Sequence, residues 1–362
     1  MTTILVTGIP GLSKQQLVDD AIKLCNDGKV FHVSLGDLIA HEAYRLWKTP
    51  KERLPFLEHS RQEILRSYAI SEAAYRLKCS GTPHKIIDTP LTMFLGGKTF
   101  NVIFGAAQIQ QLSEAAGGID YVVSLIDETE KIQSNLEGTP YPNSPGDILT
   151  WIEAEASESD SLFAGAKRNL VLPKKEAKEN LAKLITDEQP FICYFGFPIT
   201  HLKEKPGDNR EIQEEKRKHN ALIESFIQEM GKYVVNIVPL KLSDSRFDNP
   251  KDRDATVFRD LGMFIKNSDA MVAFFPVDCY STGVFSEMKQ CSDEGKPAIL
   301  IHPNNSNGKE VFGVKIFLPY DTAGQFFDAI RICYDSKFNG KPEAILRRLS
   351  LPTGSKYAHL YR

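Results

Sequence analysis

The chain has 362 residues, of which 42% are hydrophobic and 25% charged, and its formal net charge is −3 at pH 7. This length suggests two domains, and the composition supplies enough apolar side chains for two cores. The small net charge and the absence of a basic block exclude a general attraction to nucleic acid or to an anionic membrane. Neither is therefore an expected partner.

The start of the chain, Met1–Gly8, lacks the basic segment of a secretory signal and enters a strand-like run at once. No apolar run has the length needed to cross a bilayer. The six cysteines are scattered without a CxxC pair, which is typical of reduced thiols in the cytosol. We expect a cytoplasmic protein and predict no metal site from these residues.

Strand-like and helix-like runs alternate through the first half of the chain. Strands are expected at residues 4–7, 30–34, 85–88 and 121–126, and helices at 14–25, 38–47, 57–79, 148–158 and 174–184. Residues 137–147 are rich in Gly, Pro, Asn and Ser and predict a loop. Strands separated by helices indicate βαβ units and a parallel sheet.

A linker-like segment, residues 186–190 (TDEQP), precedes a second α/β pattern. Strands are expected at 191–196, 233–238, 270–276 and 297–302, and helices at 211–230, 257–266, 284–293 and 323–334. We therefore predict an α/β chain with a first domain at 1–186, a second at 190–335 and a helical tail at 336–362. Both domains are expected to hold parallel sheets, the second one doubly wound.

A phosphate-binding loop is predicted where the first strand meets the first helix. Gly8 and Gly11 let the backbone curl so that its N–H groups point inward, and the helix start adds a positive field. Lys14 stands where the phosphate-contacting lysine belongs. Ser13 and Gln15 replace the glycine and the Mg²⁺-binding hydroxyl of the full motif, however, so the loop is degenerate.

The first half resembles the adenylate kinase family, most closely its archaeal type, over about residues 3–186. The segments that carry this likeness are VTGIPG at 6–11, VSLGDL at 33–38 and IIDT at 86–89. The resemblance implies a P-loop kinase-like fold with a nucleoside-monophosphate flap near Gly36 and Asp37. No arginine occurs between Arg76 and Arg168, where the family's lid supplies several, so we favour a nucleotide-binding domain with a presenting or regulatory role over an active kinase.

The strongest functional pattern lies in the second half. Ser281, Gly283 and Glu287 follow a predicted buried strand, and the helix before that strand contains Asp260. Ligands of open α/β sheets bind at the carboxyl ends of the strands. A carboxylate beside a loop of small residues at that edge is therefore well placed for a ligand.

These segments, from about residue 191 to 303, resemble the nucleoside 2-deoxyribosyltransferase superfamily, and most closely its deoxynucleoside 5′-monophosphate N-hydrolase branch. The resemblance implies that Glu287 is the nucleophile at the anomeric carbon and that Asp260 is the general acid toward the leaving base. It also implies a substrate-binding set and a homodimer with the site near the subunit interface. That set comprises Gly196, Phe197, Pro198, Thr200, Ser281 and Gly283.

The chemistry is consistent with two carboxylates. Cleavage of the C1′–N bond builds positive charge on the sugar, which a carboxylate can stabilise or trap, and a second acid must protonate the base. The prediction is thus an N-glycosidase for a small nucleoside or nucleotide, acting by hydrolysis or transfer. Cleavage itself needs no cofactor, and ATP or another nucleotide with Mg²⁺ is expected only at the P-loop.

Three alternatives stay open: an active nucleoside-monophosphate kinase, an effector that cleaves NAD, and a nucleotide sensor without enzymatic activity. The loop after Gly196 lacks the Gly- and Arg-rich phosphate grip of the monophosphate hydrolases, so the phosphorylation state of the substrate is open as well. Asp269 is expected to be structural. The aromatic side chains Phe195, Phe197, Phe274 and Phe275 are either core residues or a surface for base stacking.

Overall fold

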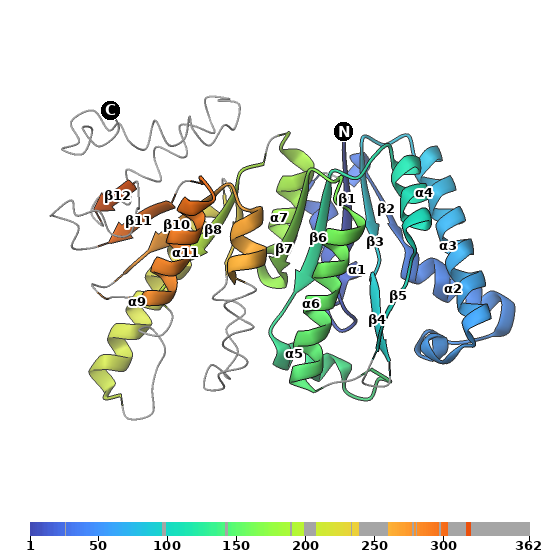
Figure 1. The fold of residues 1–362 in the computed structure, drawn as a ribbon, viewed down its shortest axis with the longest axis horizontal. Helices are drawn as coiled ribbons and strands as arrows, with labels where there is room; N and C mark the ends of the chain where they lie inside the picture. The colour runs from blue at the N-terminus through green and yellow to red at the C-terminus, as the bar shows by residue number, and fades with distance from the viewer. Residues whose placement is uncertain are drawn as a thin grey trace. The chain divides into compact units, whose positions relative to one another are not determined.

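A computed structural model describes residues 1–25, 27–95, 99–141, 144–188, 190–198, 208–232, 234–238, 260–276, 279, 281–296, 298–302 and 316–319. These residues form a mixed α/β structure with parallel sheets (Figure 1). The contacts divide the described residues into two compact units, the first comprising Met1–Thr186 and the second beginning at Asp187. The predicted helix at 323–334 and the predicted tail at 336–362 lie outside the described residues.

The sheet of the first unit has five strands in the described part, in the order β2-β3-β1-β6-β7, and every neighbouring pair is parallel. The strands are β1 (Thr2–Thr7), β2 (Val30–Ser34), β3 (His84–Asp88), β6 (Tyr121–Ile126) and β7 (Arg168–Pro173). A separate antiparallel pair is formed by β4 (Thr92–Leu95) and β5 (Thr99–Val102).

Helices cover both faces of this sheet, since successive residues of β1, Ile4, Leu5 and Val6, are all fully buried. The α-helices are α1 (Lys14–Leu24), α2 (Leu35–Trp47), α3 (His59–Cys79), α4 (Ala106–Ala116), α5 (Thr129–Leu136), α6 (Pro145–Leu162) and α7 (Lys174–Thr186). Helix α1 packs on α7, while α3 packs between α2 and α4. The short 3₁₀ segments are η1 (Asp27–Lys29) and η2 (Lys51–Phe56).

Most elements predicted in this unit are present, with ends that differ by a few residues. Helix α6 begins at Pro145, inside the predicted loop, because Ser144 caps it by accepting the backbone N–H of Asp147 at 3.2 Å. Helix α4 and strand β7 were not predicted from the sequence. The apolar run of β7 comprises only Leu170, Val171 and Leu172 between Asn169 and Pro173, so its pattern is weak.

The crossovers of this sheet change direction between β1 and β3. From β1 the chain passes over β3 to the edge strand β2, whereas from β3 it passes over β1 to β6. The carboxyl ends of these two adjacent strands therefore open into a crevice, which is the position where α/β sheets bind their ligands.

The second unit contains a parallel sheet with the order β12-β11-β10-β8-β9 in the described part. Its strands are β8 (Ile192–Gly196), β9 (Val235–Ile237), β10 (Ala270–Phe274), β11 (Ala298–His302) and β12 (Ile316–Pro319). The helical segments are α9 (Arg210–Met230), η4 (Asp260–Ile265) and α11 (Thr282–Asp293). The crossovers change direction between β8 and β10.

The core of this unit is aromatic. The ring of Phe226, from α9, stacks on Phe274 with centroids 4.6 Å apart and meets Phe195 edge-on at 5.5 Å. Asp269 joins β10 to β8, because its Oδ2 accepts the backbone N–H of Ile192 at 2.9 Å and its own N–H donates to the Ile192 carbonyl at 2.7 Å. This contact supports the structural role expected for Asp269.

Candidate functional site

The loop after β1 contains three residues with positive φ angles. Gly8 and Gly11 have φ angles of 144° and 90°, which glycine tolerates best. A Cβ on Gly8 would also lie 2.8 Å from Leu12 Cδ1 and 2.9 Å from the Leu125 carbonyl oxygen, so a larger residue does not fit. Ser13 is left-handed too, with φ 52°, at the position where the full motif has glycine.

Lys14 begins α1 and folds back over this loop. Its Nζ donates to the Gly8 carbonyl, and its pKa is lowered because burial disfavours the charged amine. Glu155 and Asp88 act in the opposite direction by attracting the positive charge. The Lys14 amine is thus bonded to the loop itself and attracted by carboxylates on α6 and β3.

A cavity of about 780 Å³ adjoins the loop at the carboxyl ends of β1, β2 and β3. Asp88 and Thr89 line it at the end of β3, and Gly36 and Asp37 line it at the start of α2. Its size lies within the range of small-molecule sites. The lining also includes charged side chains from α1, η2 and α3, namely Lys14, Asp19, Lys51, Glu52 and Arg66.

Glu155, on α6, supports the loop from within the protein, with 2% of the residue exposed. Its carboxylate accepts hydrogen bonds from the Thr7 hydroxyl and from the Gly8 N–H at 3.1 Å. It also accepts the backbone N–H groups of Leu91 and Thr92, both at 2.8 Å. One side chain therefore joins the loop after β1 to the segment after β3.

In the second unit, the carboxylate of Glu287 lies against the carboxyl end of β8. A Cβ placed on Gly196 would be 3.2 Å from Glu287 Oε2 and 3.2 Å from Val284 Cγ1. Gly196, the last residue of β8, is paired with Ala273 of β10, so this contact lies where the crossovers change direction. The structure thus brings together two residues that the sequence places 91 positions apart.

Asp260 begins η4, a π-helical segment that packs against α11, the helix of Glu287. π-Helical turns are rare and occur often at functional sites. Lys296, which follows α11, fixes the end of this segment by donating to the carbonyls of Ile265 and Lys266 at 2.7 and 2.6 Å. The backbones that carry the two predicted carboxylates are therefore neighbours.

The remaining predicted substrate residues differ in their surroundings. Phe197 and Pro198 are buried, and the Phe197 ring packs on Phe226 with centroids 6.4 Å apart. Ser281 is partly exposed directly before α11, and Gly283 is exposed in its first turn.

Phe195, Phe274 and Phe275 are buried as well, which makes these aromatic side chains part of the core rather than a surface for base stacking. Thr200 lies outside the described residues.

Two groups near the first cavity were missed by reasoning from sequence. Glu155 lies on a helix with several other acidic residues, and nothing in its pattern marks it as buried. Asp88 carried a better signal, because a carboxylate that closes a short apolar strand lies at the ligand-binding edge of a parallel sheet.

No helix in the described part of the chain is long and apolar enough to cross a membrane. No protein-family model and no curated protein matches the chain. Among solved structures, the chain is similar to a gluconokinase from Sinorhizobium meliloti 1021, with 12% identity, coverage of 51% of this chain and 88% of that chain, and a TM-score of 0.30.

Proposed function

We propose that the protein is an N-glycosidase that cleaves a nucleoside or nucleotide, with Glu287 as its nucleophile. The observation that carries the proposal is the closeness of the Glu287 carboxylate to Gly196 at the carboxyl end of β8, where a Cβ added to the glycine would lie 3.2 Å from Glu287 Oε2. In the described part, the strand order of this unit matches the flavodoxin-like doubly wound order, whose ligands bind where the crossovers change direction. A carboxylate at that point is placed to meet a sugar ring.

The proposed reaction has two steps. A Glu287 oxygen bonds to C1′ as the C1′–N bond breaks, and the base leaves with a proton from Asp260. Water then attacks C1′, returns a proton to Asp260 and releases the sugar from Glu287. In transfer, a second base replaces the water.

The first unit is proposed to bind a nucleotide, either to present it to the second unit or to regulate cleavage there. The left-handed glycines, the helix start and Lys14 fit a phosphate group. They fit Mg²⁺ less well, because Gln15 stands where the full motif has a hydroxyl ligand. Among the described residues, no group of three His, Cys, Asp or Glu side chains could hold a metal ion.

The direct test is base release from a panel of nucleosides, nucleoside mono-, di- and triphosphates, and NAD, measured by chromatography. We expect the wild-type protein to release the base from one class of substrate. The rate of base release should be lower by about 100-fold or more in Glu287→Gln, because an amide is a poor nucleophile. Ser286→Ala is the matched control, since this neighbouring side chain is exposed. A wild-type protein that releases no base from any of them would refute the proposal.

A nucleoside-monophosphate kinase is the second candidate, and the cavity beside Lys14 is the observation that favours it. The same panel with ATP and Mg²⁺ separates the two functions: phosphate transfer that is lost in Lys14→Met and retained in Glu287→Gln would establish the kinase.

The proposed homodimer is tested by light scattering of the full chain, for which we expect twice the mass of 40.6 kDa.

A further inference from the structure

An arginine is buried in the wall of the cavity of the first unit. Arg66, on α3, is 8% exposed and lines the cavity together with Gln62 and Leu65 of the same helix. Among the buried charged residues of the described part of the chain, it is the only arginine. Because burial of a charged group is costly unless that group is paired and hydrogen-bonded, the partners of its guanidinium decide what it does there.

Both hydrogen-bonding partners that Arg66 has in the described part lie on its own helix. Its Nη1 donates to Glu63 Oε1 at 2.8 Å, and its Nη2 donates to Gln62 Oε1 at 3.1 Å. Residues three and four positions apart are neighbours on any helix, so these bonds do not join α3 to another element. The buried Lys85 of β3 differs, because its Nζ donates to the Ala116 carbonyl at the end of α4 at 3.0 Å. The burial of Arg66 is therefore not explained by a bond between elements.

The guanidinium is oriented and still has donors to spare. It carries five N–H groups, and the two bonds to Glu63 and Gln62 leave three of them without an acceptor among the described residues. Gln62 is fixed in turn, because its Nε2 donates to the carbonyls of Pro55 and Leu57 at 3.3 and 2.9 Å. Arg66 is thus a preorganised donor group in the wall of a cavity.

Apolar side chains form another part of the same lining. Ile39, Met93, Ile103 and Phe104 line the cavity, and they belong to or pack against the core cluster that α3 helps to form. A ligand bound to the guanidinium therefore also meets an apolar surface. This combination suits a small organic acid better than an inorganic ion.

The ion pairs of the lining show which of its cations is open to a ligand. Lys51 is paired with Asp37 at 3.0 Å, and the Lys14 amine is bonded to the loop after β1. Arg66 has an ionic partner in Glu63, but 47% of the Glu63 side chain is exposed, and an ion pair in contact with water contributes little. The guanidinium of Arg66 is therefore the cation of this lining that is most available to an anionic group.

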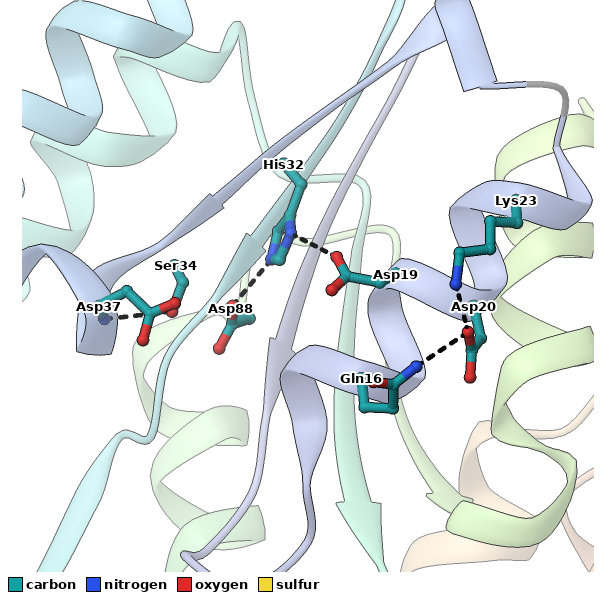
Figure 2. A network of polar contacts seen from close by, with 8 residues as sticks. All are labelled: Gln16, Asp19, Asp20, Lys23, His32, Ser34, Asp37 and Asp88. Carbon is teal, nitrogen blue, oxygen red and sulfur yellow. Dashed lines mark hydrogen bonds and ion pairs between the residues drawn. The ribbon is translucent and has the colours of Figure 1, made fainter.

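The balance of charge favours an anion with one negative charge. The lining has four carboxylates and three cations, and Figure 2 shows three of those carboxylates, on α1, α2 and β3: Asp19, Asp37 and Asp88. A phosphate ester would add a charge of about −1.5 to −2 at pH 7, whereas a carboxylate adds a single charge. A carboxylate also matches the planar fork of an arginine, which can donate two parallel N–H groups to it.

We propose that the cavity of the first unit binds a small carboxylic acid, whose carboxylate is held by Arg66 and whose apolar part lies on Met93 and Phe104. This acid site is additional to the nucleotide binding proposed for the loop after β1 and does not depend on it. The two are therefore tested with different ligands.

The first test uses phenylacetate, which joins one carboxylate to an apolar ring, and its neutral counterpart phenylacetamide. Binding of each compound to the full chain at pH 7 is measured by saturation-transfer NMR titration. We expect the wild-type protein to bind phenylacetate and to bind the amide about tenfold more weakly or worse, because the amide lacks the charge. No binding of phenylacetate, or equal affinity for both compounds, would overturn the proposal.

Arg66→Gln removes the charge and keeps a polar side chain. We expect its affinity for phenylacetate to be lower by about tenfold or more, and fluorescence-monitored unfolding shows whether the variant is folded. Arg76→Gln is the matched control, since Arg76 lies on the same helix with 49% of its side chain exposed, and it should retain the wild-type affinity. A folded Arg66→Gln protein with wild-type affinity contradicts the assignment.

Glu63→Gln tests the site in the opposite direction, by removing the charge that competes with the ligand for Arg66. We expect the affinity for phenylacetate to rise about threefold, a modest gain because the lost ion pair is partly exposed. A purely structural Arg66 predicts no gain. Unchanged or weaker binding in Glu63→Gln would therefore count against the acid site, even where Arg66→Gln fails to fold.

Phenyl phosphate and ATP separate the acid site from the phosphate-binding loop. We expect any binding of either compound to be retained in Arg66→Gln. Phenyl phosphate that binds the wild type more tightly than phenylacetate and is lost in Arg66→Gln would assign Arg66 to phosphate esters and overturn the proposal. A protein that binds phenylacetate but no ATP would keep the acid site and refute only the nucleotide binding proposed for the first unit.

Discussion

The carboxylate of Glu155 accepts the backbone N–H of Gly8 at 3.1 Å, across 147 positions of sequence. Its other hydrogen-bonding partners among the described residues, Thr7, Leu91 and Thr92, donate to it as well. An ionised side chain that only accepts is the group that this buried position requires.

Replacing Glu155 by Gln should therefore destabilise the first unit by about 2–4 kcal/mol, because the amide N–H₂ faces N–H and O–H donors. Both tryptophans of the chain, Trp47 and Trp151, lie in the first unit, so denaturant unfolding followed by tryptophan fluorescence reports on that unit. Glu158→Gln, on the same helix, is the control. A variant as stable as the wild type would contradict the role given to Glu155.

Gly196→Ala tests the proposed nucleophile through its neighbour. The new methyl would lie 2.5 Å from Met271 Cε and 3.2 Å from both Val284 and Glu287. Met271 can turn aside, but Val284 is stiff, so Glu287 is expected to shift. A displacement of about 1 Å lowers rates by roughly 100-fold, and we expect a loss of this order in base release with unchanged ATP binding.

The control for this variant is Gly165→Ala, where an added methyl meets nothing within 4 Å. Circular dichroism should show that Gly196→Ala is folded. We expect overpacking to lower its free energy of unfolding by about 1–3 kcal/mol. Base release at the wild-type rate would show that Glu287 does not act from its position beside Gly196.

The sequence was sufficient to predict the parts of the fold that have a strong local pattern. Strands β2 and β6 match the predicted residues 30–34 and 121–126, because a compact run of β-branched and aromatic residues marks each one. The hairpin β4–β5 and helix α4 were missed. Their apolar residues contact α6 and α3, and these partners lie far away in the sequence.

The same limit applies to the two candidate sites. Gly8, Lys14 and Glu287 are candidates from the sequence because they follow strands, where local order predicts the ligand-binding edge. The bonds that Glu155 makes to the loop after β1 and to the segment after β3 could not be predicted in this way. They depend on which helix covers which strand, and helix packing is not encoded in a short motif.

Ser13→Gly should stabilise the first unit by up to about 1 kcal/mol. Ser13 has a φ of 52°, a conformation that costs an L-residue roughly 1–2 kcal/mol and that glycine adopts freely, although glycine loses more entropy on folding. The Ser13 side chain makes no capping hydrogen bond that would be lost. Fluorescence-monitored unfolding measures the gain, and a loss of stability would show that the serine has a role of its own.

Lys183, on α7, gives the first unit a pH-dependent stability. Burial lowers the pKa of its amine from 10.5 to about 8, and the opposing attraction of Glu179 is smaller. Between these two pH values the unfolded chain binds more protons than the folded one, so the free energy of unfolding rises as the pH rises from 8 toward 10.5. Below pH 8 the full cost of burying the charge remains.

Lys183→Met removes this cost. Because the amine is still partly in contact with water, we expect a gain of about 1–2 kcal/mol at pH 7, less than the pKa change alone would give. The gain should shrink as the pH approaches 10.5, where the wild-type lysine is neutral in the folded protein. Lys175→Met, at an exposed position of the same helix, should show neither effect. Fluorescence-monitored unfolding at pH 7, 8.5 and 10 measures both variants, and a gain that is independent of pH would indicate better apolar packing of methionine instead of relief of a buried charge.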